Sequence, residues 1–277
     1  MKPVIKWVGG KAGNLSYIKE MLPPGFNPDS QMYYEPFLGG GAVLLELNPV
    51  QAVVSDINSE LINMYEQIKS NVEGVISYLN TLDYWHDEAK DKKAYYYRIR
   101  EDFNVSLRCN TPSQAARFIY LNKHCFNGLY RVNKKGQFNV PFNGKLSGGS
   151  FDAEHLRAVS KQLQNVQFMC GDFAWVATAE EGSLVYLDPP YDPVSTTSNF
   201  TGYAAGGFDK DEQERLCLVC NQLDKKGIRF MLSNSATPFI KELYSNFNIT
   251  IVKAKRAVNS KGDRRGEVEE VVVRNYE

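Results

Sequence analysis

The sequence of 277 residues contains no apolar run of about 18 residues, the length that a helix needs to cross a bilayer. Its first residues also lack the charged segment followed by an apolar stretch that marks a secretory signal. Lys+Arg and Asp+Glu both number 32, so any surface for nucleic acid must be a local patch. We therefore expect a cytoplasmic protein with no membrane partner, and we expect it to act as a monomer.

Cysteine is scarce, and its pattern argues against disulfides and metal. The five cysteines are odd in number and scattered, which favours reduced thiols. Cys217 and Cys220 have a CxxC spacing, but they lie in an amphipathic helical pattern without a second pair. We therefore expect them in a helix core and expect no metal site. No Pro-Cys dipeptide occurs, which disfavours methylation of the cytosine ring carbon, because that chemistry needs a thiolate nucleophile commonly carried on this dipeptide.

Two phosphate-binding glycine motifs are also missing. The opening segment Val4–Lys11 lacks the GxxxxGK spacing of a P-loop, although two glycines there let the backbone approach a ligand. Lys11 supplies a cation for a carboxylate or a phosphate. The segment Tyr33–Leu45 predicts a strand, a glycine turn and a helix, but it lacks the GxGxxG spacing of a dinucleotide fold. This counts against NAD and leaves room for a shorter ligand without a pyrophosphate.

The central stretch of the chain is Ser183–Tyr191. Leu184–Leu187 is a short apolar run that predicts a buried parallel strand, and two prolines end it directly after Asp188. Ligands of open α/β sheets bind beyond the carboxyl ends of strands. The Asp188 carboxylate and the Pro189 carbonyl can together accept both hydrogens of a planar amino group, and the Tyr191 ring can stack on its carrier. A flipped nucleobase fits this description.

A second acidic strand end supports a cofactor site. The apolar segment Ala52–Ser55 predicts a strand that ends at Asp56. In a doubly wound sheet, an acidic residue at the end of the second strand hydrogen-bonds the ribose hydroxyls of an adenosine-type cofactor. A third strand, from Gln167, ends at Asp172. Together these patterns predict an adenosine-type ligand above the glycine turn.

The order of the patterns predicts a Rossmann-like α/β fold: a doubly wound, mostly parallel sheet with a C-terminal β-hairpin, interrupted by a mainly helical domain that carries a β-hairpin of its own. We place the sheet domain at residues 1–57 and 151–277 and the inserted domain at 58–150. Asn58 is an expected helix N-cap, and Thr111–Gln114 is an expected capping box. Residues 130–142 predict the hairpin of the insertion.

The end of the chain combines a polar loop with a basic hairpin tip. Residues 193–207 predict a loop that contacts substrate, and Asp209 is an expected N-cap for a helix reaching about Leu223. Residues 249–257 and 268–276 predict the C-terminal hairpin. Its tip is rich in lysine and arginine, which favours phosphate contacts by residues that include Arg256, Lys261 and Arg264.

At this point the motifs resemble a known family, the DNA adenine methyltransferases in which a cofactor motif, a target-recognition insertion and a catalytic Asp-Pro-Pro-Tyr follow in that order. The resemblance covers nearly the whole chain and rests on these segments: Lys6–Lys11, Glu35–Gly41, Asp56–Asn58, Leu121–Asn122, Phe126–Arg131, Phe138–Phe142, Asp188–Tyr191 and Asn199–Thr201. The blocks in the insertion look like the branch that methylates adenine in GATC. After Phe142 the likeness fades, because Asn143–Leu146 lacks an expected aromatic residue.

The resemblance implies roles for individual residues. The contacts to S-adenosylmethionine would come from Trp7, Lys11, Glu35, Phe37, Gly39, Gly41, Asp56, Asp172 and Asp188. Lys6 and Arg131 would read guanines, and Asn127 and Leu129 would lie beside the flipped base. Lys134 of the insertion hairpin and Asn199 would be further contacts to duplex DNA.

We therefore expect an enzyme that transfers a methyl group from S-adenosylmethionine to the exocyclic amino group of a flipped adenine in duplex DNA. Asp188, Pro189 and Tyr191 would be catalytic, and transfer would be a direct displacement without a covalent enzyme intermediate. One alternative is the same chemistry on cytosine or on RNA. Another is a catalytically silent module that binds cofactor or DNA, and a dinucleotide oxidoreductase is a more distant third.

Overall fold

The computed structural model describes residues 1–144, 149–194, 208–255 and 267–277. Four residues predicted to contact DNA lie outside this part of the chain: Asn199, Arg256, Lys261 and Arg264. Most of the predicted loop at residues 193–207 lies outside it as well. Among the described helices, none combines the length and the apolar character that crossing a bilayer requires.

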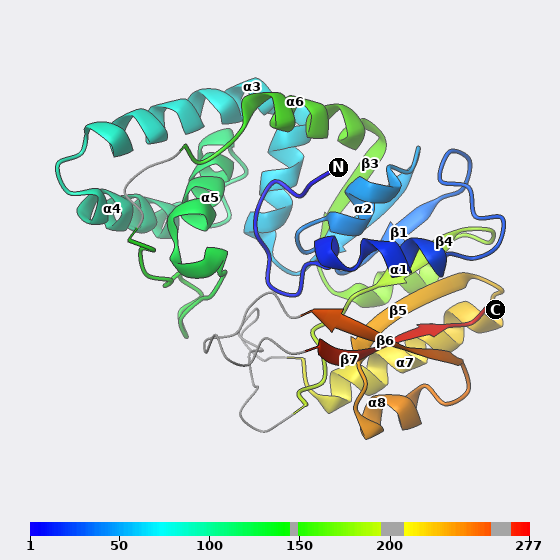
Figure 1. Ribbon diagram of the computed structural model, residues 1–277. Helices are drawn as coiled ribbons and strands as arrows, with labels where there is room; N and C mark the ends of the chain where they lie inside the picture. Colours follow the sequence, from blue (N-terminus) through cyan, green and yellow to red (C-terminus); the bar gives the residue numbers. More distant parts are fainter. Residues whose placement is uncertain (145–148, 195–207, 256–266) are drawn as a thin grey trace.

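A seven-stranded sheet forms the centre of the molecule (Figure 1). Its strands are β1 (Tyr33–Glu35), β2 (Ala52–Asp56), β3 (Val166–Cys170), β4 (Leu184–Leu187), β5 (Arg229–Ser235), β6 (Asn248–Lys255) and β7 (Glu267–Arg274). The spatial order is β3-β2-β1-β4-β5-β7-β6. The first five strands run parallel, and β7 runs antiparallel to both β5 and β6. The predicted doubly wound sheet with a C-terminal hairpin is confirmed.

Helices cover both faces of the sheet, because the buried strands are apolar on both sides. One face carries α1 (Leu15–Glu20), α2 (Ala42–Leu47), α3 (Ser59–Glu88) and α6 (Ala153–Gln162), and the other carries α7 (Lys210–Lys225), α8 (Pro238–Leu243) and the 3-10 helix η4 (Phe173–Thr178) (Figure 1). In β4, Leu184 and Tyr186 enter the first core, and Val185 and Leu187 enter the second. Cys217 and Cys220 are buried on α7, as predicted.

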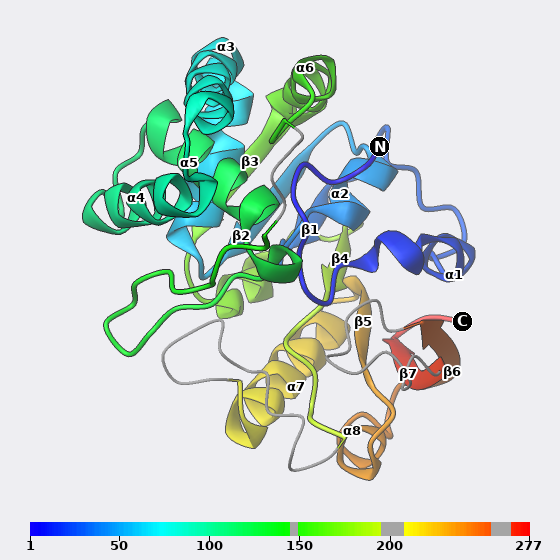
Figure 2. The ribbon, with the colours of Figure 1, turned by 60° about the vertical axis from the view of Figure 1, so that its left-hand side comes forward.

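The mainly helical segment lies to one side of the sheet (Figure 2). It contains the far half of α3, then α4 (Lys92–Val105), α5 (Pro112–His124) and the 3-10 helix η2 (Phe126–Gly128). The 30-residue helix α3 links it to the sheet and is interrupted at Asn71, whose φ and ψ of −148° and 49° are not helical. The predicted hairpin is formed by residues around an antiparallel bridge between Val132 and Phe138.

The helix starts follow the predicted caps with one correction. The Asn58 side chain accepts from the backbone N–H groups of Glu60 and Leu61, which caps α3. Thr111 Oγ1 accepts from the Gln114 N–H and caps α5. The reciprocal half of the capping box was predicted wrongly, because the Thr111 N–H donates to the Cys109 carbonyl at 2.9 Å, and Gln114 Nε2 donates to Glu60 Oε2 at 2.9 Å. The Glu60 side chain is buried and needs a hydrogen-bond donor, so Gln114 bonds Glu60 and does not complete the capping box.

Two stacked histidines lie in the core of the helical segment. The rings of His86 and His124 are 4.4 Å apart, and both side chains are almost fully buried. Tyr120 Oη lies 2.6 Å from His86 Nδ1. Burial lowers the pKa of both histidines, and that of His124 falls to about 4. Both are therefore neutral at pH 7.

This pair predicts a stability loss in mild acid. A histidine whose pKa is lower in the folded than in the unfolded chain contributes stability that is complete above the unfolded pKa and is lost as the pH falls towards the folded one. For His124 this window runs from about 6.5 down to about 4. Between pH 8 and pH 5 we expect it to lower the free energy of unfolding by about 2 kcal/mol.

The measurement is urea unfolding of the wild type and of His124→Phe at both pH values. The variant should lose less stability on acidification, since phenylalanine packs in the same aromatic cluster without a proton to bind. Asn80→Phe, at an exposed position on α3, introduces a phenylalanine without removing a histidine; it is the control and should lose as much stability as the wild type. Equal losses in the wild type and in His124→Phe would contradict the prediction.

Candidate active site

The candidate site lies where the strand order reverses. β1 and β4 are neighbours in the sheet although they are far apart in the sequence. The chain leaves β1 into the glycine turn Pro36–Gly41 and leaves β4 into the turn Asp188–Tyr191, so both turns begin at the same edge of the sheet. The crevice at such a switch point is where open α/β sheets bind ligands.

A buried ion pair joins the N-terminal segment to the acidic strand end. Lys11 Nζ lies 2.6 Å from Asp188 Oδ1, and the side chains are 5% and 18% exposed. Lys11 also donates to the Gly9 carbonyl at 2.9 Å, and its ammonium lies 4.8 Å from the centre of the Tyr191 ring. Burial raises the pKa of Asp188, and the positive charge of Lys11 opposes that rise. The carboxylate therefore has one fixed cationic partner and limited access to solvent.

Tyr191 is anchored at its hydroxyl. It donates to Glu270 Oε2 on β7 at 3.0 Å, and the Tyr17 hydroxyl approaches the same oxygen at 3.4 Å. The bond to Glu270 holds the hydroxyl end of the ring that Lys11 faces. The sequence patterns did not identify Glu270, because it lies among other glutamates and valines of β7 and comes close to Tyr191 only through the pairing of the strands.

Glu35 ends β1 beneath the site. The side chain is 2% exposed in relative terms, and its Oε2 accepts from the Tyr33 hydroxyl at 2.9 Å. Burial is the largest cause that raises its pKa, to about 8, and the nearby charge of Asp188 adds to the rise. Glu35 is therefore mostly protonated at pH 7. Its predicted contact with a cofactor remains a prediction.

Asp56 ties the glycine turn to the end of β2. Its two carboxylate oxygens accept from the backbone N–H groups of Gly39 at 3.0 Å and Asn58 at 2.9 Å. Gly39 has a φ of +48°, and a Cβ there would lie 2.9 Å from the Trp7 ring. Glycine is required at this position by both its backbone conformation and the close approach of Trp7. Each carboxylate oxygen can accept a second hydrogen bond, so Asp56 still has capacity for a ligand.

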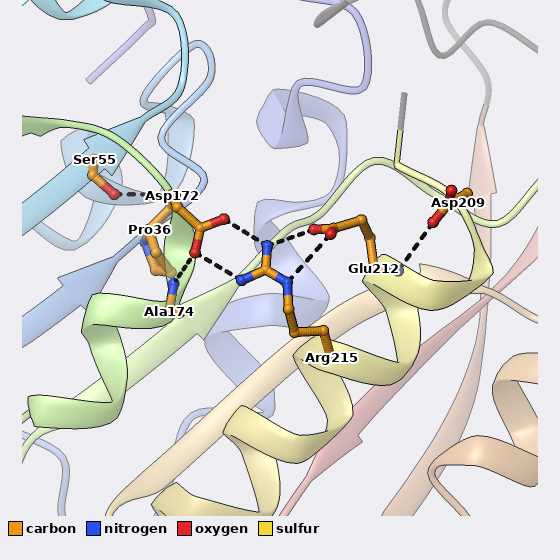
Figure 3. A network of polar contacts seen from close by, with 7 residues as sticks. All are labelled: Pro36, Ser55, Asp172, Ala174, Asp209, Glu212 and Arg215. Atoms are coloured by element: carbon orange, nitrogen blue, oxygen red, sulfur yellow. Dashed lines mark hydrogen bonds and ion pairs between the residues drawn. The ribbon is translucent and has the colours of Figure 1, made fainter. Parts of the chain in front are cut away.

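An ion-pair network lies over the same edge (Figure 3). The Arg215 guanidinium donates to both oxygens of Asp172, at 2.8 and 2.5 Å, and it also pairs with Glu212. It lies 4.1 Å from the centre of the Phe173 ring, which packs on Phe37 at 5.2 Å. Asp172 is exposed and is oriented by Arg215 from α7. The Glu212–Arg215 spacing on a helix was visible in the sequence, but nothing there indicated Asp172 as a partner.

The N-terminal segment also contacts the helical segment. Asn122 Oδ1 accepts from the Lys6 N–H at 3.0 Å, and its Nδ2 donates to the carbonyls of Lys6 and Gly128 at 2.8 and 3.1 Å. One residue further on, the Trp7 ring stacks on Tyr130 with ring centres 5.7 Å apart. Lys6 and Trp7 are thus fixed between the glycine turn and the hairpin. Asn122 lay in a motif of the resemblance, but no role had been predicted for it.

The predicted DNA contacts within the described chain lie on and near the hairpin. Arg131 is exposed, and its guanidinium donates to the Asn139 side chain at 2.8 Å and to the Asn139 carbonyl at 3.3 Å. Lys134 is exposed in the turn, Asn127 is exposed with a φ of +57°, and Leu129 is half-buried. Lys6 lies next to this group, because its side chain packs directly against the Cα of Gly128. The structure does not bring any of them into contact with Asp188.

This fold and this site define a Rossmann-like α/β protein with acidic side chains along the edge of the sheet at its switch point. The chain belongs to the D12 class N6 adenine-specific DNA methyltransferase family, whose profile matches residues 7–258. It is 43% identical to the type II methyltransferase M.MjaIII of Methanocaldococcus jannaschii, over 100% of this chain and 99% of that protein. It is 35% identical to a DNA adenine methylase of Vibrio cholerae, over 97% and 94%.

A solved rRNA methyltransferase, aviRa from Streptomyces viridochromogenes, aligns over 95% of this chain and 83% of that chain at 11% identity. The TM-score of this alignment is 0.36. The family assignment confirms the predicted enzyme class, adenine-specific DNA methylation. The alternatives of cytosine or RNA methylation and of a dinucleotide oxidoreductase do not fit this family.

The buried Glu35 predicts a stability that falls with rising pH. An acid whose pKa is higher in the folded than in the unfolded chain favours the unfolded state once that state ionises, here from about pH 4.5 up to about 8. Glu35→Gln has no charge to bury. We expect the variant to gain stability relative to the wild type as the pH rises from 5 to 8, by up to about 3 kcal/mol.

Chemical denaturation of the ligand-free proteins at pH 5 and pH 8 measures this difference. Glu181→Gln, at an exposed position before β4, is the matched control and should leave the pH dependence unchanged. If the difference between Glu35→Gln and the wild type were the same at both pH values, Glu35 would not be protonated in the folded chain.

Proposed function

We propose that this chain transfers the methyl group of S-adenosylmethionine to the exocyclic amino group of an adenine in duplex DNA, within GATC. The observation that carries the proposal is the position of Asp188. It leaves the buried strand β4 beside the glycine turn that follows β1, at the switch point of the sheet. An amino-group acceptor and an adenosine-type site therefore share one edge.

The residues along this edge fit S-adenosylmethionine. Asp56 is available to a ribose, and Asp172, oriented by Arg215, suits an adenine amino group. Phe37 supplies an apolar wall, and the positive φ angles of Gly39 and Gly41, with Trp7 and Tyr65 packed closely against them, set the shape of the turn. Lys11 can pair with the ligand's carboxylate, and Trp7 and Glu35 lie beside and beneath the same turn. When bound, the cofactor supplies an electrophilic methyl group.

The acceptor site would be built from Asp188, Pro189 and Tyr191. The Asp188 carboxylate and the Pro189 carbonyl would accept the two amino hydrogens, and Tyr191 would stack on the base. The Lys11 ammonium now faces that ring, so a flipped base would have to displace it and take over Asp188 Oδ1. The amino nitrogen would form its bond to the methyl carbon as the sulfur–carbon bond breaks. The nitrogen would then lose one proton to solvent, and the sulfur would leave as a neutral thioether.

The target would be read by the insertion, which we assign to residues 58–150, with the sheet domain at 1–57 and 151–277. Arg131 supports this role, because two bonds to Asn139 limit the motion of its exposed guanidinium. A bidentate arginine–guanine contact provides about 1–3 kcal/mol of discrimination. Lys6 would read the second guanine, Lys134 would contact phosphate, and Asn127 and Leu129 would adjoin the flipped base.

The test is to incubate the wild type and Asp188→Ala with S-adenosylmethionine and unmethylated DNA and to map methylated adenines by sequencing. We expect methylated adenine in GATC with the wild type and at least a hundredfold slower transfer with Asp188→Ala, since the amino group is then not oriented. Asp29→Ala, at an exposed position, is the control. Wild-type activity in Asp188→Ala would reject this role, and methylation outside GATC would reject the site.

A separate test addresses the cofactor role of Asp172. Arg215→Met frees the Asp172 carboxylate, so S-adenosylmethionine should bind severalfold more weakly by calorimetry. Arg157→Met is a closely matched control, because Arg157 also pairs with two carboxylates, Glu73 and Glu154, and is equally 38% exposed. Both variants should unfold within about 1 kcal/mol of the wild type. Equal effects of the two variants on cofactor binding would argue against Asp172.

A further inference from the structure

A chain of buried amides lies behind the turn that carries the proposed catalytic groups. Gln213 on α7 donates from Nε2 to the Pro190 carbonyl at 2.9 Å. Asn234 on β5 donates from Nδ2 to Gln213 Oε1 at 3.0 Å, and its Oδ1 accepts from the Asp192 N–H at 3.1 Å. Gln213 is 1% exposed and Asn234 is fully buried. The turn is thus bonded at Pro190 and at Asp192 by one connected pair of side chains.

The orientation of both amides is determined by the backbone. Asn234 Oδ1 accepts from two backbone N–H groups, those of Asp192 and of Ser235 at 2.8 Å. A backbone N–H can only donate, so this atom must be the oxygen and Nδ2 must be the donor to Gln213. Gln213 then presents its oxygen to Asn234 and its NH₂ group to the Pro190 carbonyl. No other arrangement of the two amides satisfies all four bonds.

Asp192, at the end of the turn, has further hydrogen bonds to the end of β5 and to the start of α8. Thr237, the N-cap of α8, donates from Oγ1 to Asp192 Oδ2 at 2.6 Å. Ser235 Oγ donates to the Asp192 carbonyl at 2.6 Å. Asp192 is therefore bonded through its amide, its carbonyl and its carboxylate. These buried bonds make the carboxyl-terminal side of the turn rigid.

We propose that Gln213 and Asn234 are positioning residues, which fix the direction of the Pro189 carbonyl and of the Tyr191 ring for methyl transfer. This inference rests on the proposed function. On the open side, the turn is restrained by Lys11 at Asp188 and by Glu270 at Tyr191. Lys11 must leave Asp188 when a base binds, so two restraints on the turn persist: the Glu270 bond at Tyr191 and the buried pair Gln213 and Asn234, which we call the relay. A displacement of about 1 Å at reacting groups can cost about a hundredfold in rate.

Two substitutions of Gln213 test the relay in single-turnover methylation of a GATC duplex. Gln213→Met has similar length but no donor. We expect its rate of transfer to fall at least about tenfold, while the Kd values for S-adenosylmethionine and for DNA stay within about twofold. A residue with only a structural role would reduce the amount of folded protein and leave the rate per folded molecule unchanged.

Gln213→Glu provides a pH signature. It retains an acceptor for Asn234, and it can donate to the Pro190 carbonyl only when protonated. The ratio of its rate to that of the wild type should therefore rise at least threefold as the pH falls from about 8.5 to about 6.5, because burial favours the neutral acid. Gln222→Glu, at an exposed position on the same helix α7, is the control and should give a flat ratio.

A rate for Gln213→Met within threefold of the wild type, or a flat ratio for Gln213→Glu, overturns the proposal. Hydrogen exchange at the amides of Tyr191 and Asp192 separates this failure from failure of the proposed function. Exchange should be faster in Gln213→Met whether or not methyl transfer occurs. If the wild type places no methyl on adenine, the proposed function fails. If exchange in Gln213→Met is unchanged, the relay does not restrain the turn.

Discussion

The parallel pairing of β1 with β4 is the constraint on which the site depends. These strands are about 150 residues apart in the chain, yet the register Tyr33–Leu184 and Tyr34–Val185 brings their carboxyl ends to one edge. Pairing in this register buries both strands between two layers of helices. The glycine turn and the Asp188 turn lie close together because these two strands pair, and no local feature of either turn could bring them together.

Three ionisable groups share the interior of this edge. Lys11 neutralises Asp188, and Glu35 below them avoids burying a second negative charge by remaining mostly protonated at pH 7. A buried charge without a partner costs several kcal/mol, so the pair is stable only while the two charges stay together. A base that displaces Lys11 has to supply hydrogen bonds to Asp188 in its place. In the function we propose, the ion pair occupies the position at which the amino group would be accepted.

The short N-terminal segment connects the two functional regions of the molecule. Asn122 binds the backbone of Lys6 on the side of the helical segment, and Trp7 packs between the glycine turn and Tyr130. Lys11, a few residues later, reaches Asp188. A single stretch of chain thus contacts the groups proposed to bind cofactor, to accept the target base and to read DNA. This arrangement explains why residues so close in sequence have such different predicted partners.

The sequence by itself determined the strand and helix patterns, the turn after Leu187 and the residue types at the edge of the sheet, because these depend on local periodicity, proline and glycine. It also indicated the family through motifs that the profile match confirmed. Only the tertiary structure decided which side chains meet. Gln114 bonds Glu60 instead of closing its capping box, Arg215 reaches Asp172, and Gln213 reaches Pro190. Each of these contacts joins elements that are distant in the chain, and their geometry follows from the packing of those elements against one another, for which a local pattern carries no signal.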